Sequence, residues 1–271
     1  MPNAKLLTGL FAALCFLLFS FTPRVNAAVL NRLLLRPHAL SYDANEFEKL
    51  SASYNCERQT FNNIWGEPLN AWFIRNPARQ GEIASVVFYL MGRDADCAAR
   101  AKAVTQILES GSSVFIFDYS GFGLSKGNAS VNQMFWDSDF ALNFLTVDLG
   151  VDIDQTIFFG ESMGCAIAVS LANRYCPAAL VLKSAFTDLP RAMREQWPIL
   201  KVVPSAIMRV KKLEVLKNLR EVEIPLLIAH GLNDRLISCH NAIDLYHAAA
   251  ARTADAASLL LLEQSRHAYM S

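Results

Sequence analysis

The stretch QTIFFGESMG, residues 155–164, decides the fold of this chain. Its first half is a short run of β-branched and aromatic residues, which predicts a buried strand over Gln155–Gly160. A helical pattern of apolar residues follows at once over Cys165–Tyr175. A Gly-x-Ser-x-Gly motif between a strand and a helix predicts a sharp, strained turn that lifts the central hydroxyl above the edge of a sheet. Ser162 is therefore the candidate nucleophile.

From about Ala84 onward the chain repeats this alternation of short apolar strands and longer helical segments. We expect strands at Ser85–Leu90, Ser113–Tyr119, Gln155–Gly160, Ala178–Lys183, Pro225–His230 and Ala257–Glu263. We expect helices at Ala95–Ser110, Val131–Val147, Cys165–Tyr175 and Asn241–Ala251. Such alternation is typical of the α/β class, with a mostly parallel central sheet and helices on both faces. The aromatic stretch Tyr54–Ile74 predicts an antiparallel hairpin at the edge of that sheet.

A segment without any strand pattern, at about residues 187–222, separates two of the predicted strands. It is rich in Lys, Arg and Met and carries Pro190, Pro198 and Pro204, which predicts two or three short helices. Its position in the chain fits a small helical lid.

A serine hydroxyl needs an imidazole that takes its proton, and the imidazole needs a carboxylate that fixes its tautomer. Asp234 follows the predicted strand Pro225–His230, and His267 follows the last predicted strand, so both lie on loops at the same sheet edge as Ser162. Asp188 also follows a strand and is a rival acid, although an Asp in such a place is often a turn former or a helix cap. The sequence predicts a catalytic triad of Ser162, Asp234 and His267.

The oxyanion that develops on an attacked carbonyl group needs backbone N–H donors. Met163 follows the nucleophile and supplies one donor by its position. The second is expected from the loop after the strand Ser85–Leu90, which reads Leu90-Met91-Gly92-Arg93, and we assign it to the amide of Arg93. Chemistry of this type proceeds through an acyl-serine and uses no metal and no cofactor.

Composition restricts the possible partners. The 271 residues, 53% of them hydrophobic, suffice for one domain with a large core, which we place at residues 28–271. Lys and Arg together number 25, as do Asp and Glu, so no net field attracts a phosphate backbone and nucleic acid is not an expected partner. The sequence gives no indication of oligomeric state.

Residues 1–27 have the pattern of an export signal. Lys5 precedes an apolar run over Leu6–Phe21, and Val25-Asn26-Ala27 offers a cleavage site. The run is slightly long for a signal core and shorter than the roughly 18 to 20 residues that span a bilayer, so a cleaved signal peptide and an uncleaved membrane anchor both stay open. We expect an exported protein, periplasmic or secreted, with association at a membrane surface as a further expectation.

The cysteines beyond that segment form an odd set, so at least one of them is unpaired within the chain. They are Cys56, Cys97, Cys165, Cys176 and Cys239. Their spacings fit neither a zinc knuckle nor a C-x-x-C redox pair. We expect buried, inert thiols, with room for one disulfide.

Four sequence blocks carry a resemblance to a known family. Residues 117–125 read FDYSGFGLS, residues 160–164 GESMG, residues 184–189 SAFTDL and residues 230–234 HGLND. They resemble the DYxGxGxS, GESxG, SxFTxL and HGxxD blocks of the α/β-hydrolase domain-containing serine hydrolases, in particular the branch of protein depalmitoylases and related membrane-associated or exported esterases. The resemblance covers roughly Tyr54–His267. It implies the α/β-hydrolase fold and the cleavage of carboxylic ester or thioester bonds in a small-molecule or lipid-like acyl substrate.

Two features depart from that family. The family has His-Gly-Asn after the first parallel strand, whereas this chain has Met91-Gly92-Arg93, which puts the support of the oxyanion loop and the fit of substrate in question. The sequence also ends a few residues beyond His267, where the family has a closing helix, so we expect the loop that carries His267 to be less firmly held. An amide or peptide hydrolase and a non-catalytic binding protein on the same scaffold both stay open as alternatives.

Overall fold

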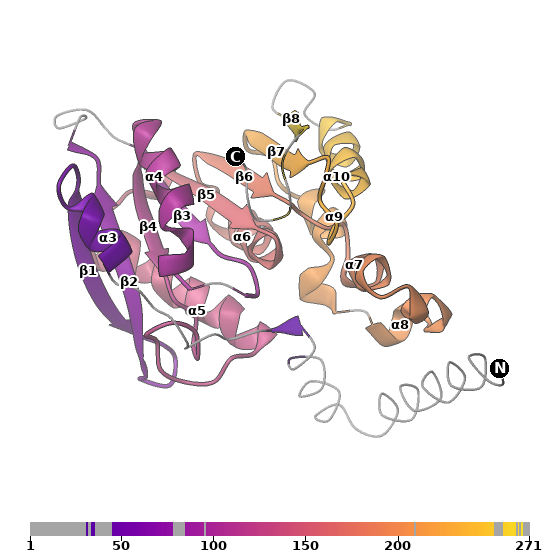
Figure 1. The fold of residues 1–271 in the computed structure, drawn as a ribbon, viewed down its shortest axis with the longest axis horizontal. Coiled ribbons are helices and arrows are strands. Elements are labelled where there is room, and N and C mark those ends of the chain that lie inside the picture. The colour runs from indigo at the N-terminus through magenta and orange to yellow at the C-terminus, as the bar shows by residue number, and fades with distance from the viewer. Residues whose placement is uncertain are drawn as a thin grey trace.

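The computed structural model describes residues 31, 34–35, 45–77, 85–94, 96–208, 210–251, 257–263, 265 and 267. These residues form one eight-stranded sheet flanked by helices (Figure 1). The expected export signal at residues 1–27 lies outside the described residues. In the part of the chain that is described, no helix has the length and apolar character that a membrane span requires.

The sheet has the strand order β1-β2-β4-β3-β5-β6-β7-β8. The strands run at β1 Asn55–Asn62, β2 Pro68–Arg75, β3 Val86–Leu90, β4 Ser113–Phe117, β5 Thr156–Glu161, β6 Ala179–Lys183, β7 Leu226–Gly231 and β8 Ala257–Leu262. β1 and β2 form an antiparallel hairpin, and β2 also pairs antiparallel with β4. All other neighbouring pairs are parallel, so the carboxyl ends of β3 to β8 meet at one edge. The predicted edge hairpin and mostly parallel sheet are confirmed.

The predicted strands begin and end within one or two residues of the observed ones. The largest difference is at β4, which was expected to reach Tyr119 and ends at Phe117. The cause is the buried carboxylate of Asp118, which accepts hydrogen bonds from the amide of Cys97 at 2.7 Å and from that of Leu124 at 3.1 Å. These bonds favour a turn over continued pairing.

Helices fill the intervals between the parallel strands. They run at α3 Asn45–Leu50, α4 Ala101–Glu109, α5 Val131–Asn143, α6 Met163–Tyr175, α7 Leu189–Gln196, α8 Ser205–Met208, α9 Val215–Leu219 and α10 His240–Ala250. The helix predicted over Val131–Val147 continues beyond α5 as a π-helical turn at Phe144–Asp148, and the one predicted over Ala95–Ser110 includes a 3₁₀ turn at Ala98–Arg100. From β3 to β4 the chain moves through α4 toward the β1 edge of the sheet, whereas from β5 to β6 it moves through α6 toward the β8 edge. Because such crossovers are right-handed, α4 and α6 lie on opposite faces of the sheet.

Aromatic side chains fill the centre of the sheet. Phe88, Phe115, Phe117 and Phe158 come from three adjacent parallel strands and are fully buried. The ring centroid of Phe88 lies 5.9, 6.0 and 5.7 Å from those of the other three. Separations of this size are typical of favourable aromatic pairs. This packing fixes the position of the carboxyl end of β3 relative to that of β5. The candidate site lies at these two strand ends.

The insertion between β6 and β7 contains helices and no strand among its described residues, as the sequence predicts. α7, α8 and α9 alternate there with 3₁₀ turns at Pro198–Val202 and Lys211–Leu213. α7 is fastened to α10, because Arg191 pairs with Asp244 at 2.5 Å and Asn241 donates to Glu195 at 3.0 Å. The role of this insertion as a lid stays a prediction.

The five cysteines beyond the expected signal are all free thiols. Cys97 and Cys165 are buried, and Cys176 is exposed. Burial raises the pKa of the thiols of Cys97 and Cys165. The expected burial is confirmed for these two residues, and a thiol that stays protonated is a poor nucleophile. The expectation is wrong for exposed Cys176, and the one disulfide left open by the sequence is not formed among these five described residues.

Candidate active site

Ser162 occupies the turn between β5 and α6. Its backbone angles, φ 54° and ψ −115°, lie outside the regions that ordinary residues adopt. The turn is held by its N–H, which donates to the carbonyl group of Lys183 at 2.9 Å. Glycine is required on both sides, because a Cβ at Gly160 would lie 2.6 Å from Cα of Cys165 and one at Gly164 would lie 2.0 Å from the carbonyl oxygen of Leu90. The strained turn predicted from the motif is therefore present.

The structure brings Ser162, His267 and Asp234 into one hydrogen-bonded chain. Nε2 of His267 lies 3.0 Å from Oγ of Ser162, and Nδ1 lies 2.7 Å from Oδ2 of Asp234. An ionised carboxylate only accepts hydrogen bonds, so Nδ1 carries the proton and donates it to Asp234. The lone pair on Nε2 then faces the hydroxyl of Ser162, which donates to it. This arrangement allows His267 to remove the Ser162 proton as the hydroxyl attacks a carbonyl carbon.

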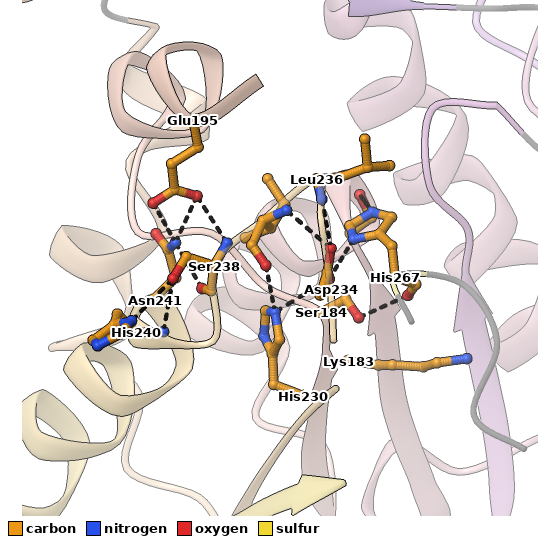
Figure 2. Close-up of polar contacts among 12 residues, drawn as sticks. Lys183, Ser184, Glu195, His230, Asp234, Leu236, Ser238, His240, Asn241 and His267 are labelled. Atoms are coloured by element: carbon orange, nitrogen blue, oxygen red, sulfur yellow. Dashed lines mark hydrogen bonds and ion pairs between the residues drawn. The ribbon is translucent and has the colours of Figure 1, made fainter. Parts of the chain in front are cut away.

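The carboxylate of Asp234 is fully buried, and each oxygen meets two donors (Figure 2). Oδ1 accepts from the amides of Leu236 at 2.8 Å and Ile237 at 3.0 Å. Oδ2 accepts from His267 and, at 3.2 Å, from Nε2 of His230. Burial alone would raise the pKa of this carboxyl group, but the hydrogen bonds from His230 and His267 hold the pKa of Asp234 well below its usual range. Asp234 is therefore ionised at neutral pH.

Contacts from the loops after β6 and β7 hold the loop that carries His267. Oγ of Ser184 donates to the carbonyl group of His267 at 2.8 Å (Figure 2). The backbone N–H of Asn233 donates to the carbonyl group of Ser265 at 3.2 Å. Gly231 permits this approach, because a Cβ there would lie 2.2 Å from the Ser265 carbonyl oxygen. The loops after β6, β7 and β8 are thus tied together around the imidazole.

Asp188, the rival acid from the sequence, has a different role. It is the N-cap of α7, where Oδ1 accepts from the amide of Arg191 at 2.9 Å. A cap of this kind typically stabilises a helix by about 1 kcal/mol. Since Asp234 is the residue that contacts His267, it is the acid of the hydrogen-bonded chain.

A narrow cleft with a volume of about 40 Å³ adjoins Ser162 and His267. Its apolar wall consists of Leu34, Met163, Phe186, Leu189, Ala192, Met193, Trp197 and Ile237. Arg93 and Gln196 also line it, and Arg93 donates to Oε1 of Gln196 at 3.3 Å. This bond connects the loop after β3 with α7. Across the described residues, no group of three or more His, Cys, Asp or Glu side chains is arranged to hold a metal ion.

Comparison with known proteins finds relatives in sequence and in structure. The chain matches the serine aminopeptidase S33 family over residues 81–214. An uncharacterized protein of Mycobacterium tuberculosis H37Rv is 31% identical over 185 residues, which cover 68% of this chain and 64% of that protein. The α/β-hydrolase domain-containing protein 17B of Xenopus laevis is 31% identical over 135 residues, 49% of this chain and 44% of that protein. The chain has the α/β-hydrolase fold and is similar in sequence to the α/β-hydrolase domain-containing proteins. It spans less than two thirds of the length of these curated relatives.

Solved structures have the same fold as this α/β-hydrolase. An esterase of Pyrococcus furiosus aligns with a TM-score of 0.67 at 16% identity, over 86% of this chain and 90% of the esterase. An acylaminoacyl peptidase of Pyrococcus horikoshii aligns with a TM-score of 0.62 at 15% identity, over 84% of this chain and 40% of the peptidase. At such identities the likeness establishes the fold alone.

The loop after β3 packs directly against the nucleophile in this α/β-hydrolase. A Cβ at Gly92 would lie 3.2 Å from Cβ of Ser162, which explains why a glycine stands there. The side chain of Met91 is fully buried, whereas Arg93 lines the cleft. The departure from the family pattern therefore changes the lining of the cleft. The assignment of the Met163 and Arg93 amides as oxyanion donors stays a prediction.

Three polar residues near the hydrogen-bonded chain were missed by the sequence interpretation. His230 precedes Asp234 by four residues in the HGLND block, and that spacing was an available signal. Ser184 adopts a φ of 53° directly after β6, which no local sequence pattern indicates. Glu161, the second residue of the GESMG motif, is buried against residues distant in the chain, so no local pattern reveals its role.

Proposed function

We propose that this α/β-hydrolase cleaves carboxylic ester or thioester bonds through an acyl-Ser162 intermediate. The observation that carries the proposal is the chain of hydrogen bonds from Asp234 through both ring nitrogens of His267 to Ser162, at 2.7 and 3.0 Å. His267 takes the Ser162 proton during attack and gives it to the leaving group. Water then attacks the acyl-serine while His267 takes a proton from it. The bond between the acyl group and Oγ of Ser162 breaks as His267 returns that proton to Oγ, and Asp234 stabilises the imidazolium in both steps.

The amides of Met163 and Arg93 are the proposed donors to the oxyanion. Met163 opens α6, so the partial positive charge at the start of that helix adds to the stabilisation of negative charge. Gly92 allows the loop after β3 to approach Ser162 closely enough for a neighbouring amide to take part. The side chains at positions 91 and 93 do not enter this step, so the departure from the family pattern is compatible with it.

The lining of the cleft supports an apolar acyl group as the bound part of the substrate. Leu34, Phe186, Leu189, Met193 and Trp197 surround the space next to Ser162. An aminopeptidase must accommodate the charged amino group of its substrate, and a carboxylate is the natural partner for such a group. Among the described residues that line the cleft, none is an Asp or a Glu. The lining therefore favours an ester or thioester over a peptide with a free amino terminus.

The narrow cleft also supports a lid role for the insertion at about residues 187–222. Its volume of about 40 Å³ is far below the roughly 300 to 1,000 Å³ of usual ligand sites. α7 supplies Leu189 and Met193 to the cleft, and the opposite face of the same helix, with Arg191 and Arg194, borders a wider cavity of about 740 Å³. A movement of α7 into this cavity is the proposed opening step, and it would have to break the contacts of Arg191 and Glu195 with α10.

A panel of nitrophenyl esters with acyl chains of increasing length tests the proposal. We expect wild-type protein to hydrolyse at least one of them and the Ser162→Ala variant to lose that activity by a factor of about 10³ or more. Ester hydrolysis that is the same in both proteins, or no hydrolysis by a folded wild-type protein, would contradict the proposal.

The match to the serine aminopeptidase S33 family favours a second candidate, the hydrolysis of amide or peptide bonds. The same three residues would carry that reaction, and only the recognition of substrate differs. Aminoacyl nitroanilides compared with acyl esters of matched side-chain size separate the two candidates. A larger kcat/KM for the nitroanilides would replace the ester proposal with this one.

We further propose that the substrate is met at a membrane surface. Ile64 and Trp65, in the turn between β1 and β2, are exposed, and the ring of Trp65 lies 6.4 Å from that of exposed Trp136. This turn lies at the carboxyl edge of the sheet, because β2 runs antiparallel to β4. Tryptophan is the residue that prefers membrane–water interfaces. Sedimentation with lipid vesicles tests this: binding should weaken when both Trp65→Ser and Trp136→Ser are introduced, and equal binding by the variant would contradict it.

A further inference from the structure

A buried charged cluster that the hydrogen-bonded chain does not use lies behind Ser162. It consists of Glu161, Arg100, Lys183 and Tyr89, and we call it the Glu161 cluster. Glu161 is 1% exposed and Arg100 8%. One carboxylate faces two cations in this cluster, and buried charges are costly unless they are paired. Its position next to the candidate nucleophile calls for a specific explanation.

Glu161 is the centre of the cluster. Oε1 accepts a hydrogen bond from Nη2 of Arg100 at 2.6 Å, and Oε2 accepts from the hydroxyl of Tyr89 at 2.5 Å. Nζ of Lys183 lies 3.8 Å from Oε2. Charge-assisted bonds of this length are among the strongest in proteins. Both carboxylate oxygens are therefore engaged, and the side chain has little freedom.

The strongest partners of Glu161 lie at the two ends of one loop. Tyr89 is the next-to-last residue of β3, and Arg100 ends the 3₁₀ turn Ala98–Arg100. Between them lies Arg93, whose amide is proposed as an oxyanion donor. Since Glu161 immediately precedes Ser162, a single carboxylate ties both ends of this loop to the turn that carries the nucleophile.

The third partner fastens the same turn from the other side. The carbonyl group of Lys183 accepts the N–H of Ser162 at 2.9 Å, while the ammonium group of Lys183 approaches Glu161. The turn and the loop after β3 are also in close contact, because a Cβ at Gly164 would lie 2.0 Å from the carbonyl oxygen of Leu90. A small shift of the loop would therefore change the distance between its amides and the reacting carbonyl group.

We infer that Glu161 is a positioning residue that holds the loop after β3, described at residues 91–94 and 96–99, against Ser162 and thereby sets the geometry of the oxyanion site. Its catalytic consequence rests on the proposed function, whereas the tether can be tested without any substrate. An oxyanion exists only in the transition state and the intermediates, so a displaced loop lowers kcat and leaves KM nearly unchanged. If Glu161 had only a structural role, its replacement would lower the amount of folded protein, and the folded fraction would keep the kcat and KM of wild type.

The Glu161→Gln variant removes the charge and keeps the size of the side chain. Asp137→Asn is a matched control, because Asp137 is equally buried and accepts bonds from the amide of Ser120 at 2.7 Å and from Gln133 at 2.7 Å. These partners belong to the loop after β4 and to α5, outside residues 90–99. A Tyr89→Phe variant removes one hydrogen bond from Glu161 and leaves every charge in place.

Hydrogen exchange of peptides that cover residues 90–99, measured by mass spectrometry, reports on the tether. In Glu161→Gln we expect exchange in that loop to be faster by about tenfold or more, with a smaller increase in Tyr89→Phe and no change there in Asp137→Asn. Wild-type exchange in a folded Glu161→Gln would overturn the inference. If Glu161→Gln fails to fold, the Tyr89→Phe variant decides, and its unchanged loop would overturn the inference equally.

Steady-state kinetics then test the catalytic consequence. We expect kcat to fall by about ten- to a hundredfold in Glu161→Gln with KM within about twofold of wild type. A rise in KM at unchanged kcat, or an equal fall of kcat in Asp137→Asn, would contradict the positioning role. If wild-type protein hydrolyses neither esters nor amides, the proposed function fails, and the exchange experiment still decides whether Glu161 tethers the loop.

Discussion

Nε2 of His230 lies 3.2 Å from Oδ2 of Asp234, so one carboxylate oxygen serves two imidazole rings. The same Nε2 lies 2.9 Å from the carbonyl oxygen of Ile237, which can only accept, so Nε2 carries a proton. His230 thus acts as a donor that orients Asp234 toward His267.

Replacement of His230 by Phe should therefore lower activity without any contact to the substrate. The His230→Phe variant keeps a ring of similar size and removes the donor to Asp234, and we expect kcat to fall by about ten- to a hundredfold. Steady-state kinetics measure this, with His240→Ala as a control because His240 is exposed at the start of α10. Wild-type kcat in a folded His230→Phe would show that His230 has no orienting role.

Asp234 should also make the stability of the fold depend on pH. The pKa of Asp234 is lower in the folded protein than in the unfolded chain, where it is about 3.9. Ionised Asp234 therefore contributes fully to the free energy of unfolding above about pH 4, and this contribution is lost as the pH falls toward the pKa of the folded state. In urea unfolding, the free-energy difference between wild type and Asp234→Asn should be constant from about pH 7 to 5 and shrink below about pH 4. A difference that grows as the solution becomes more acidic would contradict this account.

Gly92 should be more important for rate than for stability. In Gly92→Ala the new Cβ lies 3.2 Å from Cβ of Ser162, so the loop after β3 must move by a few tenths of an ångström. We expect kcat to fall by about tenfold or more, because the oxyanion donors move with the loop. Thermal unfolding of the same variant should stay close to wild type. A large loss of thermal stability with an unchanged kcat would reverse the assignment.

The cysteines should differ in their reactivity toward thiol reagents. Cys176 is exposed, whereas burial raises the pKa of the thiols of Cys97 and Cys165. A disulfide reagent at pH 8 should therefore modify Cys176 in the native protein and reach the other two after denaturation. Peptide mapping identifies the modified residues. Rapid modification of native Cys165 would mean that the turn around Ser162 is open to solvent.

The strands, the nucleophile turn and the members of the hydrogen-bonded chain could be predicted from the sequence because their signals are local. Gly160 and Gly164 flank Ser162 within one strand–turn–helix unit, and Asp234 and His267 each follow a strand directly. The order of these units along the chain then places them at one sheet edge.

The remaining parts of the site depend on contacts between distant segments. Arg100, Tyr89 and Lys183 reach Glu161 from three different stretches, and each residue alone has an ordinary local pattern. Leu34 lies far ahead of the sheet in the chain and still lines the cleft. Only the folded arrangement brings such residues together.

The identity of the residue that forms the covalent bond tests the central claim most directly. A fluorophosphonate reagent phosphonylates an activated serine, and peptide mapping locates the modification. We predict modification of Ser162 in wild-type protein, none at this position in Ser162→Ala, and a rate lower by about 10³ or more in His267→Ala. A folded wild-type protein that stays unmodified, or is modified at another serine, would contradict the role assigned to Ser162, His267 and Asp234.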